Sequence, residues 1–217
     1  MTSFSIKDCA LAAIATGKKA QSLRELRDRL STIQTGSIYY HFWGGLLRPR
    51  FDDPEYNNDF AAWSRHGLND ARLAERLAVI DPTDFDDLEA LRHELIEVIE
   101  ERLDESELVP WSQADQQFYF IHSQIVVFDT HKRIKDPREL AHIIPHISVS
   151  SVFYHFIDAR RRTPDSIDDF QAWLKGFGNK YAELCAELAS IDPYFTTLTQ
   201  LRDRLTLLFS SYFEEGA

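Results

Sequence analysis

Cysteine is scarce in this chain of 217 residues, and its two copies, Cys9 and Cys185, stand far apart. A disulfide framework needs an even set of cysteines at a regular spacing, so we expect two reduced thiols in a cytoplasmic protein. Long apolar runs are also absent, and no stretch approaches the roughly 20 residues that span a bilayer. The N-terminus has no basic region followed by an apolar stretch, so neither a secretory signal nor a membrane contact is predicted.

Basic residues are outnumbered, with 24 lysines and arginines against 35 acids and a formal net charge of −11. Extended phosphate backbones bind to basic surfaces, so this balance disfavours nucleic-acid binding. The acids concentrate over residues 84–107, where only Arg92 and Arg102 offset them. This acidic helix is either a solvated face that keeps the protein soluble or a surface for a protein partner.

Complete catalytic motifs are missing from the sequence as well. There is no Gly-x-Ser-x-Gly elbow, and neither cysteine has a histidine at a spacing typical of nucleophilic catalysis. No cofactor motif is complete. The sequence therefore favours a non-catalytic binding or regulatory protein without a cofactor.

The chain does contain an internal similarity. Residues 37–42 (Ser-Ile-Tyr-Tyr-His-Phe) return as residues 151–156 (Ser-Val-Phe-Tyr-His-Phe), at an offset of 114. Residues 59–63 (Asp-Phe-Ala-Ala-Trp) return as 169–173 (Asp-Phe-Gln-Ala-Trp). Internal repeats decide the architecture before local signals do. We therefore predict a duplication, with a first repeat at 1–103, a linker at 104–117 and a second repeat at 118–217.

Each repeat is expected to begin with a short β-hairpin and to continue with helices. Residues 118–121 and 125–128 are β-branched and aromatic, and three polar residues separate them. Residues 4–6 and 11–14 are their counterparts. Capping signals at Ser22 and Asp136 begin the first helices, and longer helices are predicted over 58–79, 166–190, 84–103 and 195–213. The predicted fold is mainly α (α+β), a tandem hairpin-plus-helices unit whose two halves pack about a pseudo-two-fold axis.

The repeated hexapeptide contains the candidate site. On a helix, Ser37, Tyr40 and His41 lie on one face, as do the equivalent residues of the second copy, Ser151, Tyr154 and His155. One interpretation is a pocket in which the imidazole carries a proton or binds a ligand. The other is that the buried histidine and tyrosine satisfy each other and nearby carbonyls. Because packing constraints duplicate as faithfully as sites, the sequence leaves both open.

Two basic pairs, Lys18-Lys19 and Lys132-Arg133, follow the predicted hairpins and precede a helix N-terminus. Free amide groups there attract anions, so the pairs could assist the histidine face in binding a small anion such as a phosphorylated metabolite. The alternative is a solvated turn. Thr16-Gly17-Lys18-Lys19 lacks the full glycine spacing of a phosphate loop.

Metal binding has one candidate spacing. His142 and His146 stand four residues apart, and His155 could complete three nitrogen ligands of a metal-dependent enzyme. Pro145 makes a regular helical turn doubtful at this point. We therefore keep this function as a further alternative and predict no metal.

The order of these motifs resembles a known family. An aromatic strand start (Phe118-Tyr119-Phe120) and a Thr-Gly-Lys turn (16–18) are followed by Arg-Glu-Leu (24–26) and Ser-x-x-Tyr-His (37–41). This order is similar to a bacterial family of internally duplicated proteins known only as a domain of unknown function. The resemblance covers nearly the whole chain and implies no activity and no catalytic residues.

Overall fold

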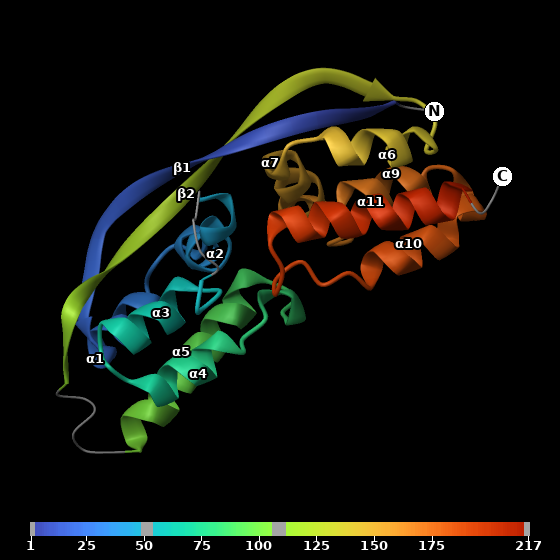
Figure 1. Ribbon diagram of the computed structural model, residues 1–217. Coiled ribbons are helices and arrows are strands. Elements are labelled where there is room, and N and C mark those ends of the chain that lie inside the picture. The colour runs from blue at the N-terminus through green and yellow to red at the C-terminus, as the bar shows by residue number, and fades with distance from the viewer. Residues whose placement is uncertain (1–2, 49–53, 106–111, 215–217) are drawn as a thin grey trace. The chain divides into compact units, whose positions relative to one another are not determined.

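Two long strands form the single sheet of the described structure, a computed structural model that describes residues 3–48, 54–105 and 112–214 (Figure 1). Strand β1 (Phe4–Ser22) pairs with β2 (Gln113–Ile134). The Thr16 hydroxyl donates to the Phe120 carbonyl at 2.7 Å, and the Thr130 hydroxyl donates to the Ile6 carbonyl at 2.5 Å. The later residue of one strand faces the earlier residue of the other, so the strands are antiparallel.

The predicted hairpins are therefore wrong. Residues 118–121 and 125–128 belong to one continuous strand, as do residues 4–6 and 11–14. The segment between the two apolar runs of β2, residues 122–124, contains no glycine, proline or asparagine to turn the chain. It stays extended because its partner is β1, about a hundred residues away. The predicted tandem hairpin-plus-helices unit is wrong for the same reason. The predicted packing of two such halves about a pseudo-two-fold axis is therefore wrong as well.

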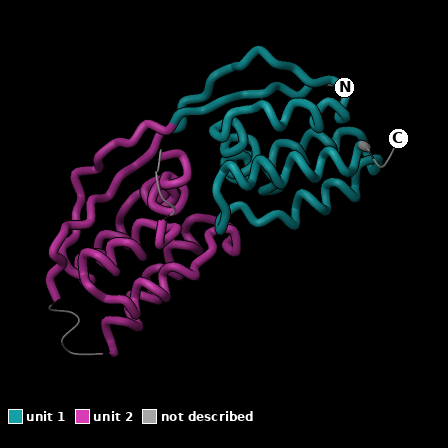
Figure 2. The backbone as a smooth tube through the Cα atoms, in the orientation of Figure 1, with its two compact units in different colours: residues 1–10, 125–217 teal, residues 11–124 magenta. Residues whose placement is uncertain are grey.

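The chain divides into two compact units, shown in Figure 2. Unit 1 contains residues 1–10 and 125–217, and unit 2 contains residues 11–124. Each unit thus takes one end of each strand. This division differs from repeat boundaries at 103 and 118, which remain a prediction. Within the predicted linker, residues 106–111 lie outside the described residues, and residues 113–117 belong to β2.

Unit 2 packs its helices against its part of the sheet. Its first helix begins as the sequence predicts, because the Ser22 hydroxyl accepts from the backbone N–H of Glu25 at 3.2 Å. Phe118 and Phe120 of β2 are buried, and the Phe118 ring stacks on Phe60 at 5.2 Å. The helices are α1 (Leu23–Leu30), α2 (Thr35–Trp43), η1 (Gly44–Leu47), α3 (Asp59–His66), α4 (Ala71–Ala78), η2 (Pro82–Asp84) and α5 (Leu88–Asp104).

Unit 1 is built in a similar way. Phe4 and Ile6 of β1 are buried, and the Phe4 ring lies 5.4 Å from that of Phe170. The helices are α6 (Glu139–Ile143), η4 (Ile144–His146), α7 (Val149–Val152), the π-helix η5 (Phe153–Asp158), α8 (Ala159–Arg162), α9 (Asp169–Lys175), η6 (Gly178–Tyr181), α10 (Ala182–Ala189) and α11 (Leu198–Glu214).

The helices predicted over 84–103 and 195–213 are confirmed as α5 and α11. Those predicted over 58–79 and 166–190 are wrong as single helices, because each is interrupted. Gly67 ends α3, and Asn69 has a φ of 57°, outside the helical region. Gly178, at a φ of 71°, interrupts the second segment. Among the described residues, no helix is both long and apolar enough to cross a membrane.

Candidate functional site: two strand clamps

In unit 2, helix α2 binds both backbone groups of one strand residue. The Ser37 hydroxyl donates to the Ile121 carbonyl at 2.7 Å. Four residues along the same helix, Nε2 of His41 accepts from the Ile121 N–H at 3.1 Å. The Ser37 hydroxyl and the His41 imidazole thus satisfy the two backbone groups that a neighbouring strand would otherwise hydrogen-bond.

The other ring nitrogen of His41 contacts an acid. Nδ1 lies 2.8 Å from a carboxylate oxygen of Asp59, the first residue of α3. Because Nε2 accepts a hydrogen bond, Nδ1 carries the proton and donates to Asp59. Burial lowers the pKa of His41, and this effect outweighs the opposing influence of Asp59. His41 is therefore held neutral in a single tautomer. We call Ser37, His41 and Asp59 the unit 2 clamp.

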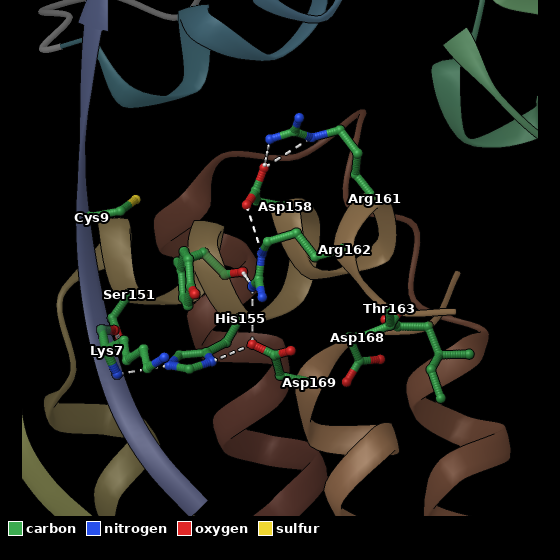
Figure 3. A network of polar contacts seen from close by, with 12 residues as sticks. Lys7, Cys9, Ser151, His155, Asp158, Arg161, Arg162, Thr163, Asp168 and Asp169 are labelled. Atoms are coloured by element: carbon green, nitrogen blue, oxygen red, sulfur yellow. Dashed lines mark hydrogen bonds and ion pairs between the residues drawn. The ribbon is translucent and has the colours of Figure 1, made fainter. Parts of the chain in front are cut away.

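Unit 1 repeats this arrangement (Figure 3). The Ser151 hydroxyl donates to the Lys7 carbonyl at 2.6 Å, and Nε2 of His155 accepts from the Lys7 N–H at 2.9 Å. Nδ1 of His155 lies 2.7 Å from Asp169, the first residue of α9. Ser151, His155 and Asp169 form the unit 1 clamp. Its strand residue, Lys7, precedes Ile121 by the same 114 positions that separate His41 from His155.

The unit 1 clamp is joined to an arginine network. The Arg162 guanidinium contacts Asp169 at 3.1 Å and Asp158 at 2.8 Å (Figure 3). It also lies over the Tyr154 ring, 4.0 Å from the ring centre. Asp158 is 1% exposed and also pairs with Arg161 at 2.8 Å. Burial acts to raise the pKa of Asp169, but the bonds from His155 and Arg162 lower it overall. The carboxylate of Asp169 is therefore held ionised by fixed donors.

The tyrosines of the predicted site lie at the edge of the clamps. In unit 2, Arg48 bonds the Tyr40 hydroxyl and lies 4.8 Å from the centre of its ring. Gly44 follows one turn later, and a Cβ atom there would lie 2.8 Å from the Tyr40 ring. The equivalent position in unit 1 is Asp158, in a π-helix. Short π-helical segments often occur at functional sites. This one places the buried carboxylate of Asp158 between Arg161 and Arg162.

The structure brings the serine and histidine of each copy together on a strand. Both nitrogens of each imidazole are already hydrogen-bonded, so a ligand at either ring would have to displace a strand or an aspartate. These contacts favour the structural interpretation of His41 and His155. Ligand binding by the serine, tyrosine and histidine of each copy stays a prediction.

The basic pairs follow no hairpin, although Lys18-Lys19 does precede the N-terminus of α1. Lys18-Lys19 is part of β1 and Lys132-Arg133 is part of β2, so the predicted turns are wrong. Within these strands Gly17 has a φ of 74° and His131 a φ of 60°, left-handed values that are typical of a β-bulge. Arg133 contacts Asp129 at 2.6 Å, which lowers the pKa of that carboxyl.

The structure does not bring together the three histidines considered as candidate metal ligands. His142 and His146 are exposed, whereas His155 is buried with both nitrogens bonded. Among the described residues, no group of three His, Cys, Asp or Glu side chains is placed to hold a metal ion. Cys9 is buried, and burial, followed by the charge of Asp8, raises the pKa of its thiol to about 12. This thiol stays protonated near neutral pH.

Sequence reasoning missed Asp59 and Asp169, whereas Arg162 belongs to a run of three arginines that stands just beyond the second histidine segment. A signal for the first two was present, because the Asp-Phe-x-Ala-Trp pattern occurs in both copies and begins with these acids. That pattern suggests buried tryptophans. Trp63 is buried, and its indole N–H donates to the Gln116 carbonyl at 2.6 Å, whereas Trp173 is only half-buried.

Comparison with known proteins agrees with this fold without assigning a reaction. Residues 1–210 match the protein family described as "Family of unknown function (DUF5752)". A solved structure, "The structure of OrfY from Thermoproteus tenax", is similar with a TM-score of 0.83 and 25% sequence identity. The match covers 97% of this chain and 95% of that chain. No curated protein matches the sequence.

Proposed function

Since the chain belongs to this family of unknown function, we propose a role from its own surface: a non-catalytic cytoplasmic protein that binds a partner polypeptide along strand β2. We also propose, as the sequence analysis expects of the family, that the protein is bacterial and arose by internal duplication. The clamps support it because their polar groups are used to hold strands.

A run of exposed apolar residues carries the proposal. In unit 1, Val126 and Val127 are each 43% exposed and Phe128 is 51% exposed. Successive side chains of a strand point to opposite faces, so both faces of β2 are open to solvent here. Grouped apolar side chains on a surface mark interaction sites more often than single ones do.

The backbone of this segment is also open to a partner. At Lys7 and Ile121 the clamps occupy the strand's outward N–H and C=O groups. Within the described residues, no side chain from a helix bonds the backbone of Val126, Val127 or Phe128. A two-stranded ribbon leaves one edge of each strand unpaired, and an extended peptide can add to such an edge.

A photo-crosslinking residue at Val127 tests the proposal. We expect one reproducible adduct from a native extract, and we expect Val126→Lys to abolish it, because a charge on an apolar contact is costly to bury. The matched control places the crosslinker at Leu207, an exposed apolar residue on α11 of the same unit. No adduct at Val127, or the same adduct at Leu207, would refute the role.

Small-anion binding is the alternative function, and one observation favours it. Lys19 and Lys132 are exposed and form no ion pair with the described residues. A thermal-shift titration with inorganic phosphate tests it against Lys19→Gln and Lys132→Gln. A shift that neither variant reduces, or the absence of a shift in the wild type, removes this alternative.

A further inference from the structure

A groove in unit 2 lies between the end of α4 and one face of α5, two helices that pack side by side (Figure 1). Its apolar surface comes from Val79, Ile80, Phe85 and Val98. Val79 follows the last residue of α4 and is 75% exposed, which is unusual for a valine beside other apolar groups.

The α5 side of the groove is straight and regular. Glu94, Val98 and Glu101 stand at positions i, i+4 and i+7, so they form one stripe along the helix. At a rise of 1.5 Å per residue this stripe is about 10 Å long, or two helical turns. The groove therefore has an apolar centre with an acid at each end.

The charge of the groove is strongly one-sided. Four acids line it (Asp81, Asp84, Glu94 and Glu101), against the single cation Arg76. Arg76 is already paired with Glu105 at 2.5 Å. In the described structure, Asp84, Glu94 and Glu101 form no ion pair. The acids repel one another across an apolar floor, and a cationic partner would relieve that repulsion.

We propose that this groove binds a basic amphipathic helix of a partner protein. The apolar face of that helix packs on Val79, Phe85 and Val98, and its lysines or arginines meet Glu94 and Glu101. A helix fits better than an extended strand, because the groove is formed by one face of α5 and the segment that joins α4 to α5, and it offers no sheet edge. This site is separate from the β2 segment at Val127, so either can fail without the other.

Fluorescence anisotropy with a labelled synthetic peptide tests the proposal. The probe is an 18-residue helix of leucines on one face and lysines on the other, and the comparison peptide carries glutamates in place of the lysines. We expect binding of the lysine peptide only, with at least tenfold weaker affinity when NaCl rises from about 50 to 200 mM. Glu94→Gln combined with Glu101→Gln is expected to weaken binding at least tenfold, and Val79→Ser is expected to weaken it severalfold.

The matched control removes the same charge outside the groove. Glu75 on α4 and Glu97 on α5 are exposed and do not line it. Glu75→Gln combined with Glu97→Gln is expected to change the affinity less than twofold. An equal loss in both double variants would show general charge attraction and overturn the proposal, as would equal binding of both peptides. A mass that rises with protein concentration and falls with Val79→Ser would assign the groove to a second copy of this chain instead.

Discussion

The backbone N–H of Lys7 donates to Nε2 of His155 at 2.9 Å, although the two residues are 148 positions apart in the sequence. The pair of bonds at this residue fixes which strand position faces helix η5. A strand shifted by one residue would turn the buried Phe4 and Ile6 to the opposite face. The clamps therefore attach each strand to a helix and also determine which strand residue faces that helix.

Replacing His155 by alanine should destabilise the protein substantially. The change leaves the Lys7 N–H without its acceptor, removes one donor from Asp169 and opens a cavity among aromatic rings. We expect a loss of about 2–4 kcal/mol in the free energy of unfolding, measured by urea denaturation. The control is His93→Ala on an exposed face of α5, which should cost less than about 0.5 kcal/mol. Equal effects would contradict the clamp.

Stability should fall as the pH drops below about 6.5. Burial lowers the pKa of His41 in the folded state, so the unfolded chain takes up its proton first. The contribution of His41 is fully present above the unfolded pKa and is lost as the pH falls through the folded pKa. Asp169 also has a lowered pKa, but its contribution is lost only below the usual range of a carboxyl, about 3.9.

Melting curves between about pH 5 and 8 measure this effect. His41→Gln removes the titrating group, so its melting temperature should depend less on pH than that of the wild type in this window. A variant that keeps the full pH slope would assign the effect to another group.

The two arginines that hold Asp158 should differ in importance. Arg162 also contacts Asp169 and lies over the Tyr154 ring, whereas Arg161 is 48% exposed. We expect Arg162→Ala to cost about 2–3 kcal/mol, because it weakens the partners of a buried carboxylate. Arg161→Ala should cost less than about 1 kcal/mol. Chemical denaturation of both variants checks the order, and the reverse order would show that the contact with Asp169 is unimportant.

A close contact in unit 2 predicts a destabilising substitution and a second substitution that restores stability. A Cβ atom at Gly36 would lie 2.4 Å from Cε1 of His122, which is inside contact distance. Gly36→Ala should therefore destabilise the protein by about 1–3 kcal/mol, although alanine is the better helix former. Adding His122→Ala should recover most of the loss in a double-mutant cycle. Strictly additive effects would mean that the two side chains do not compete for this space.

Local sequence signals predicted the helices that have a capping residue or a regular leucine spacing. Ser22 caps α1 as expected, and the leucine spacing of α5 and α11 gave their positions closely. The interruptions at Asn69 and Gly178 were missed, because apolar periodicity continues through them on both sides.

The sheet could not be predicted from local sequence. Residues 118–128 have the composition of two strands, but whether they fold back depends on a partner strand far away in the chain. The role of His41 as a hydrogen-bond acceptor could not be predicted for the same reason. Its burial and its serine neighbour were predictable from the helical spacing, whereas its acceptor role depends on a strand residue 80 positions away.

The crossing of the strands between units affects how the protein is made. Residues 4–10 emerge from the ribosome more than a hundred residues before the helices that cover them. Unit 2 can fold once β2 has been made as far as Gln124. Phe4 has to wait, unburied, until η5 and α9 are synthesised, because these helices supply the rings that it packs on. Residues 4–10 therefore stay accessible to other proteins until those helices are made.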